Sequence, residues 1–184
     1  MKTILITGAT SGIGLAAAKK LANEKNQLIL CGRRQRKLDE ISEELSKSAN
    51  VLSLCFDVSN KNEVSKLLSS LPKEFCSVDI LINNAGNAHG LDTIQDGSLD
   101  DWDNMIDSNV KGLLYVSRVI MPKMIEKQSG HIINIGSLAG REVYEKGNIY
   151  CATKHAVNAI SKAMRIDLNK TGIKVSEINP GLVE

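Results

Sequence analysis

The chain has 184 residues, of which 42% are hydrophobic, 24% are charged and 3% are aromatic, and its formal net charge is +2 at pH 7. These values are ordinary for a folded globular protein and argue against an intrinsically disordered chain. Scarce aromatic residues and dispersed Lys and Arg disfavour a nucleic-acid partner. No apolar run has the length of a membrane span or of a signal-peptide core. We therefore expect a single domain over residues 1–184 in the cytoplasm, with no membrane partner.

Short apolar runs alternate with longer stretches of helical periodicity along the whole chain. The runs are rich in Ile, Leu and Val and nearly continuous, which is typical of strands covered on both faces of a parallel sheet. The pattern predicts an α/β fold with a Rossmann-type doubly wound sheet in three α/β/α layers. The predicted strands are Thr3–Thr7, Gln27–Cys31, Val51–Phe56, Asp79–Ile82, His131–Ile135 and Lys174–Ile178, and the predicted helices are Gly14–Asn23, Arg36–Ser48, Lys61–Leu71, Leu99–Lys127 and Tyr150–Thr171.

The last two predicted helices carry more apolar surface than one sheet can cover. In the first of them apolar residues fall on almost every face between Trp102 and Ile125. A helix that is apolar all round needs cover on more than its sheet side. We expect a second copy of the chain to supply it, giving a homodimer or homotetramer through helices 99–127 and 150–171. A partner segment outside this sequence is the alternative.

A glycine-rich turn follows the first predicted strand and leads straight into a helix. It reads Thr7-Gly8-Ala9-Thr10-Ser11-Gly12-Ile13-Gly14. Glycines let the backbone approach a pyrophosphate, whose charge the amides of the helix N-terminus accept. The GxxxGxG spacing differs from the general GxGxxG motif, and such turns also arise for steric reasons alone. The position between strand and helix nevertheless favours a dinucleotide site.

The end of the second strand indicates which dinucleotide. An NAD site normally has Asp or Glu there, bonded to the ribose hydroxyls. Here the sequence is Cys31-Gly32-Arg33-Arg34, and no acidic residue appears before Asp39. A guanidinium suits the 2′-phosphate of NADP through forked, charge-assisted hydrogen bonds. The alternative is that both arginines are solvated charges at a helix start. The missing acid favours NADP over NAD.

Further motifs appear in order, each at its expected strand or helix end. They are Asp57-Val58, Asn83-Asn84-Ala85-Gly86, Asn109, Gly136-Ser137, Tyr150-x-x-x-Lys154 and Pro180-Gly181. With them the chain resembles the short-chain dehydrogenase/reductase family over its whole length. The stretches from Trp102 to Asn109 and from Asn179 to Glu184 resemble the NADP-dependent 3-hydroxy acid dehydrogenases of that family, which act on serine and allo-threonine. The resemblance implies hydride transfer between NADP(H) and a small 3-hydroxy acid, or the matching oxo acid or semialdehyde.

The resemblance also implies which residues contact the cofactor. Asp57 and Val58 would lie at the adenine, the Asn83–Gly86 turn at the ribose, and the residues from Pro180 onward at the nicotinamide. The full expected set is Gly8, Thr10, Ser11, Gly12, Ile13, Gly14, Arg33, Arg34, Asp57, Val58, Asn83, Ala85, Gly86, Tyr150, Lys154, Pro180, Gly181 and Val183.

Tyr150 and Lys154 share one face of a predicted helix, one turn apart. A free tyrosine loses its proton near pH ~10, and a neighbouring ammonium lowers that pKa. Tyr150 can then take the alcohol proton in oxidation or return it in carbonyl reduction. Ser137 can hydrogen-bond the substrate oxygen. By resemblance, Lys154 holds the nicotinamide ribose and Asn109 sustains a water-linked proton path to Lys154.

Several alternatives and boundaries remain open at this level. The cysteines and histidines have no metal-ligand spacing, so we expect no metal and a structural role for the three histidines. The loop Leu138–Ile149 must border the substrate, and Arg141 and Tyr144 are candidates for a carboxylate. A reductase of sugars, steroids or acyl-carrier ketones, and a non-catalytic NADP-binding regulatory module, are the competing functions. The family normally continues past Gly181, so we expect a C-terminal strand and lid to be missing, with an exposed edge at the sixth strand.

Overall fold

The computed structural model describes residues 1–182. Its six strands form one sheet in the order β3-β2-β1-β4-β5-β6, and every neighbouring pair is parallel. The predicted doubly wound Rossmann sheet is therefore confirmed, with β6 at one edge and β3 at the other. The strands are β1 (Lys2–Thr7), β2 (Asn26–Gly32), β3 (Asn50–Cys55), β4 (Ile80–Asn83), β5 (Gly130–Ile135) and β6 (Ile173–Ile178).

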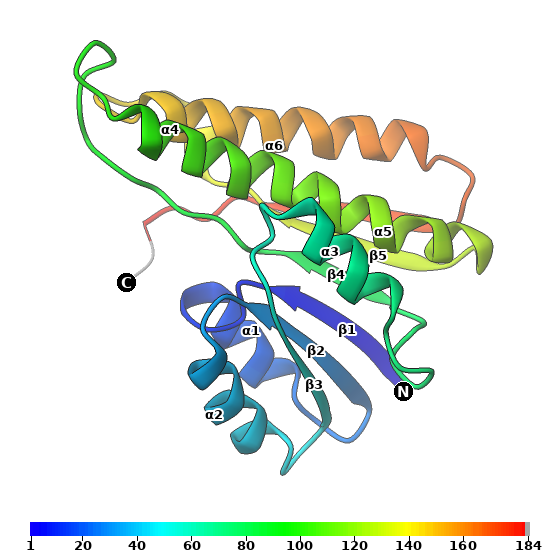
Figure 1. The fold of residues 1–184 in the computed structure, drawn as a ribbon. Helices are drawn as coiled ribbons and strands as arrows, with labels where there is room; N and C mark the ends of the chain where they lie inside the picture. Colours follow the sequence, from blue (N-terminus) through cyan, green and yellow to red (C-terminus); the bar gives the residue numbers. More distant parts are fainter. Residues whose placement is uncertain (183–184) are drawn as a thin grey trace.

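Helices cover the sheet on both sides (Figure 1). Helices α1 and α2 lie on one face, and α3 to α6 lie on the other, which gives the three expected layers. The helices are α1 (Gly12–Leu21), α2 (Gln35–Leu45), α3 (Lys61–Ser69), α4 (Leu99–Ile106), α5 (Leu113–Glu126) and α6 (Asn148–Asp167).

Two hydrophobic cores, one on each face of the sheet, explain the continuous apolar character of the strands. Along β1, Ile4 and Ile6 pack with the core under α1 and α2, whereas Leu5 packs with the core under α3, α5 and α6. Burying an Ile or Leu side chain contributes about 1.5–3 kcal/mol to the stability of the fold.

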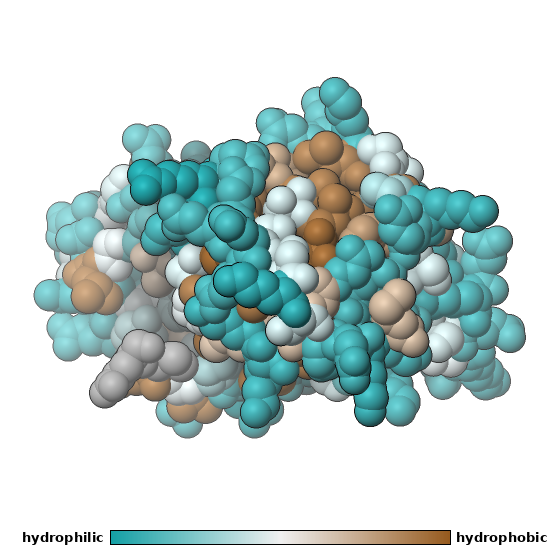
Figure 2. Space-filling model, turned by 90° about the horizontal axis from the view of Figure 1, so that it is seen from below, coloured by the Kyte–Doolittle hydropathy of each residue, from teal (hydrophilic) through white to brown (hydrophobic). Residues whose placement is uncertain are grey.

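Seen from the side of α1 and α2, the surface is mostly hydrophilic with a compact hydrophobic patch (Figure 2). None of the helices within residues 1–182 is long and apolar enough to cross a membrane.

The predicted continuous helix over Leu99–Lys127 is wrong in one detail. Between α4 and α5 the chain forms a π-helical segment, η1 (Asp107–Gly112). Such segments are rare and frequent at functional sites. The buried side chain of Asn109 lies in η1, and Gly112 there approaches Val58 so closely that a Cβ would be 2.7 Å from its Cγ2. The wider π-helical turn thus brings Gly112 against Val58, which follows β3 at the carboxyl end of the sheet.

Candidate active site

A cavity of about 820 Å³ opens at the carboxyl ends of the strands. The chain crosses to the other side of the sheet between β1 and β4, and ligands of open α/β sheets bind at such switch points. The volume lies in the range of ligand pockets. From the expected site, the cavity is lined by Gly8, Thr10, Ser11, Gly12, Ile13, Arg33, Arg34, Asp57, Val58, Ala85, Gly86, Ser137, Tyr150, Lys154, Pro180 and Gly181.

The glycines of the first turn let the backbone fold back on itself. Gly8 has a φ of +66°, and a Cβ on Gly14 would lie 2.4 Å from the carbonyl oxygen of Gly8. Gly12 has a φ of +53° with open space where a Cβ would be. The side chain of Ser11, the residue before α1, caps none of the helix amides. The free amides at the start of α1 are suited to an anion.

Asn84 fastens the end of β4 to this turn, a role that the sequence analysis did not assign. Its Nδ2 donates to the carbonyl oxygens of Thr7 and Gly8, at 2.9 and 3.1 Å. In return, the hydroxyl of Thr7 accepts the backbone N–H groups of Asn84 and Ala85, both at 3.0 Å. The available signal was the position of Asn84 directly after an apolar strand, where polar side chains meet other strand ends.

Arg34 is anchored rather than merely solvated. Its Nη2 donates to the hydroxyls of Thr10 at 2.6 Å and Ser11 at 2.8 Å. Arg33 Nη1 lies 3.4 Å from the carboxylate of Asp57. Burial raises the pKa of Asp57, but hydrogen bonds from Ser59 and the charge of Arg33 together outweigh it and hold that pKa below its ordinary value. The cavity therefore has a cationic end with two hydroxyls beside it.

Tyr150 and Lys154 lie at the other end of the cavity. The Nζ of Lys154 is 5.7 Å from the ring centre of Tyr150 and donates to the carbonyl oxygen of Ile135 at 3.0 Å. Lys154 is only 8% exposed. Burial lowers the pKa of Lys154 to about 8, an effect that the negative charge of Glu177 opposes. The predicted proximity of phenol and ammonium is confirmed.

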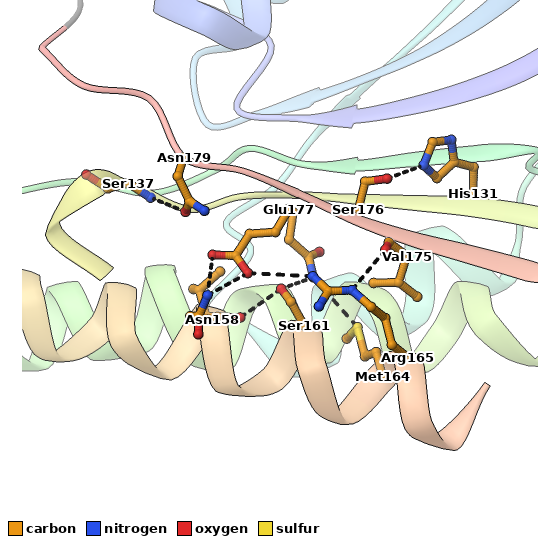
Figure 3. A network of polar contacts seen from close by, with 12 residues as sticks. His131, Ser137, Asn158, Ser161, Met164, Arg165, Val175, Ser176, Glu177 and Asn179 are labelled. Carbon is orange, nitrogen blue, oxygen red and sulfur yellow. Dashed lines mark hydrogen bonds and ion pairs between the residues drawn. The ribbon is translucent and has the colours of Figure 1, made fainter. Parts of the chain in front are cut away.

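Ser137 follows β5 and begins the short 3₁₀ helix η2 (Leu138–Gly140). Its hydroxyl accepts the N–H of Ala139 at 3.1 Å, and its own N–H donates to Asn179 Oδ1 at 3.0 Å, as Figure 3 shows. These bonds fix the residue at the cavity wall with Tyr150.

The side chain of Asn109 is fully engaged with its neighbours. Nδ2 donates to the carbonyl of Asn87 at 2.8 Å and to the hydroxyl of Thr153 at 3.0 Å. Oδ1 accepts the N–H of Asn87 at 2.8 Å and the hydroxyl of Ser108 at 3.3 Å. The side chain therefore fastens the loop after β4 to α6 at Thr153, the residue directly before Lys154.

Within the described residues, two expected cofactor residues, Gly14 and Asn83, are not among those that line the cavity. Gly14 lies buried beneath the turn. The amide of Asn83 points into the helix layer, where Nδ2 donates to Ser117 Oγ and Asn134 Oδ1, both at 2.9 Å. Its side chain is thus a core contact, because it points to the face of β4 that is covered by α5. Val183 lies outside the described residues.

A second cavity of about 440 Å³ adjoins the first, and Ala88 and Tyr150 line both. Tyr144 lines it as expected, together with Lys146, whereas Arg141 is not among its lining residues within the described chain. The remaining lining residues are His89, Gly90, Leu91, Met105, Gly147 and Asn148.

The predicted structural role fits two histidines better than the third. His131 bonds to Ser176 and His155 to the carbonyl of Cys151, both at 2.9 Å, but His89 lines the second cavity. Within residues 1–182 no group of three or more His, Cys, Asp or Glu side chains is arranged to hold a metal ion.

Comparison with known proteins supports the same picture. The chain is 44% identical to the NADP-dependent 3-hydroxy acid dehydrogenase YdfG of Escherichia coli strain K12 over 180 residues. The aligned region covers 98% of this chain and 72% of that relative. The chain is 45% identical to the NADP-dependent 3-hydroxy acid dehydrogenase of Schizosaccharomyces pombe, over 100% of this chain and 72% of the relative. The solved closed form of serine dehydrogenase complexed with NADP⁺ superposes with a TM-score of 0.95 at 43% identity, over 99% of this chain and 73% of that one.

The family model for short chain dehydrogenases matches residues 2–184. The matched residues include the six parallel strands, the glycine-rich turn and the Tyr150–Lys154 pair. The chain belongs to the short chain dehydrogenase family and is an oxidoreductase.

Proposed function

We propose that the protein is an NADP-dependent dehydrogenase that oxidises the hydroxyl carbon of a small 3-hydroxy acid, or reduces the matching carbonyl. The observation that carries the proposal is the position of Tyr150, beside the buried Lys154 and at the junction of two cavities. The larger cavity suits a dinucleotide and the smaller one suits a small acid. The relatives named as NADP-dependent 3-hydroxy acid dehydrogenases support the substrate class.

The donor set of the larger cavity fits NADP. The glycine turn gives a pyrophosphate access to the start of α1. The guanidinium of Arg34 and the hydroxyls of Thr10 and Ser11 can together donate to a 2′-phosphate. Asp57 and Val58 would border the adenine, and Pro180 and Gly181, at the opposite end of the cavity, would border the nicotinamide. When bound, NADP(H) supplies the carbon that accepts or releases the hydride.

The residues of the chain handle the proton. The ammonium of Lys154 stabilises a phenolate on Tyr150, because a nearby positive charge favours the ionised phenol. Tyr150 then removes the hydroxyl proton during oxidation and donates it during reduction. The Ser137 hydroxyl holds the substrate oxygen and stabilises the charge that develops on it. The side chain of Asn109 bonds to Asn87 and Thr153, so it would sustain a water-linked path to Lys154 by holding these neighbours in place.

The smaller cavity would hold the substrate. Ala88, Leu91 and Met105 give it an apolar wall, and Lys146 adds a cation that suits a carboxylate. Its volume of about 440 Å³ exceeds that of one small hydroxy acid, so longer 3-hydroxy acids would also enter.

The proposal is tested by incubating the protein with serine, allo-threonine or 3-hydroxypropionate, with NADP⁺ and NAD⁺ in parallel. We expect reduced nicotinamide to form with at least one of the three acids and faster with NADP⁺. Binding of NADPH without turnover of any acid or of the matching carbonyl compounds would contradict the proposal. That result would favour a non-catalytic NADP-binding module.

We further propose a homodimer or homotetramer, assembled through α4, α5 and α6. Leu114 on α5 is 41% exposed and Ile166 on α6 is 75% exposed. The small residues Ala152, Ala159 and Ala163 are also exposed along α6. Their spacings of seven and four residues place them on one side of the helix. Such a strip permits close packing of a second helix. The cytoplasmic location remains a prediction from the sequence.

A further inference from the structure

Glu177 on β6 is a buried carboxylate that the proposed reaction does not use. Its side chain is 4% exposed. Both of its oxygens accept from Asn158 Nδ2 on α6, each at 3.0 Å, and Arg165 Nη2 lies 3.8 Å from Oε2 (Figure 3). Burying an ionised carboxylate is costly unless it is paired and hydrogen-bonded. A buried carboxylate at Glu177 therefore indicates a role other than filling space in the core.

The carboxylate lies beside the segment that holds Lys154. Asn158 follows Lys154 by four residues on α6, so the two side chains share one face of that helix. The Nζ of Lys154 donates to the carbonyl of Ile135, the last residue of β5. The next residue is Gly136, where a Cβ would lie 2.8 Å from Glu177 Oε1. Ammonium and carboxylate thus contact adjoining residues at the end of the same strand.

We propose that Glu177 is a positioning residue for Lys154. Its carboxylate, fixed by Asn158 and given room by Gly136, keeps the Lys154 ammonium charged and in place beside Tyr150. The inference rests on the proton-transfer function proposed for Tyr150 and Lys154, and it adds a residue from β6 to that machinery.

The charges around Lys154 show why a carboxylate is needed. Lys154 is buried, and burial disfavours the ammonium form. Tyr150 faces it from its own helix, β5 presents only uncharged residues there, and Arg165 faces Glu177 from farther along α6. Glu177 is the negative charge that opposes the effect of burial on the Lys154 pKa. An uncharged Lys154 would no longer favour the phenolate of Tyr150.

The direct test is Glu177→Gln, which removes the charge and keeps the shape of the side chain. Lysines are labelled with ¹³C at Cε, and the Lys154 signal is assigned by its loss in Lys154→Ala. Without cofactor or substrate, NMR should show Lys154 losing its proton at a pH lower by about 1, because an opposite charge has been removed. The alkaline limb of the pH profile of kcat/KM for oxidation should move in the same direction.

The matched control is Arg165→Gln, which breaks the other ionic contact of Glu177 but keeps the carboxylate. In this variant Lys154 should titrate at the wild-type pH or above it, because a positive charge has been removed. An unchanged Lys154 titration in folded Glu177→Gln would overturn the proposal. So would an equal decrease in Arg165→Gln, since that would show general loosening of the network.

If Glu177→Gln does not fold, Glu177→Asp provides the same test, because it keeps the charge but withdraws it from Asn158. The Lys154 titration should then move to lower pH by less than 1, and no movement would overturn the proposal. The NMR titration requires no substrate. Failure of every hydroxy acid in the turnover assay would therefore contradict the proposed function alone, and an unmoved Lys154 signal would contradict this inference alone.

Discussion

Arg34 illustrates how one side chain can define the cofactor. It leaves the end of β2 and reaches across to the turn after β1, where Thr10 and Ser11 accept its hydrogen bonds. These bonds hold the guanidinium at the mouth of the cavity before any ligand arrives. A pre-positioned donor loses less side-chain entropy on binding than a free one. The side chain of Arg33 is 66% exposed and bonds to Asp57 instead.

We predict that Arg34→Met weakens NADPH binding by about 10–100-fold, because a hydrogen bond to a charged group contributes about 1.5–3 kcal/mol. Binding of NADH, which has no 2′-phosphate, should change by less than about threefold on the same grounds. Fluorescence titration with both nucleotides measures the two affinities. Arg36→Met is the control, since Arg36 is exposed and bonds to Glu40 on its own helix. Equal losses for NADPH and NADH in Arg34→Met would contradict this role.

Some residues of the candidate site were predictable from the sequence, but their individual roles were not. Arg33 and Arg34 were predicted because the acid typical of NAD sites is missing, and the structure places both in the cavity wall. Asn83 is the last residue of β4 and Asn84 follows it directly. Successive side chains of an extended chain point to opposite faces of the sheet. The motif alone did not reveal that Asn84 fastens the turn while Asn83 enters the core. The roles differ because the side chain of Asn83 points to the face covered by α5, whereas that of Asn84 points to the glycine-rich turn.

At the scale of elements, the π-helical segment η1 was not predictable from periodicity. Met105, Val110 and Leu113 continue an apolar pattern that is compatible with an unbroken helix. The interruption arises from tertiary contacts, because Asn109 must reach both Asn87 and Thr153. Polar residues within an apolar helix were the available signal, and they indicated burial without indicating the change of helix type.

Helix α6 carries the prediction for assembly. Replacing the exposed Ile166 by Glu places a charge on the strip that we propose to be covered by a second copy. Sedimentation velocity should show the wild type as a dimer or tetramer and Ile166→Glu shifted towards the single chain. Val143→Glu is the control, because Val143 is 71% exposed in a loop outside the helices. A wild type that sediments as a single chain at micromolar concentration would refute the proposed assembly.

At the scale of the whole molecule, most of the fold was predictable. Because helices cover both faces of the sheet, its strands are apolar throughout. In β2, for example, Leu28, Ile29 and Leu30 are all fully buried. The strand order follows because right-handed crossovers permit few alternatives. Side-chain networks were not predictable, since contacts such as Glu177–Asn158 join residues of different elements across the interior.

Tyr150, at the junction of the two cavities, is the residue that we propose to transfer the proton of the substrate hydroxyl while the hydride passes to or from the nicotinamide. The most direct measurement is turnover of a 3-hydroxy acid with NADP⁺ by Tyr150→Phe, compared with wild type and with Tyr115→Phe, because Tyr115 is not among the lining residues of either cavity. Tyr150→Phe should bind NADPH within about threefold of wild type, yet lose about 10²–10⁴-fold in kcat, the contribution of general acid–base catalysis. Tyr115→Phe should keep its kcat. A Tyr150→Phe variant that retains kcat within about tenfold would contradict the account.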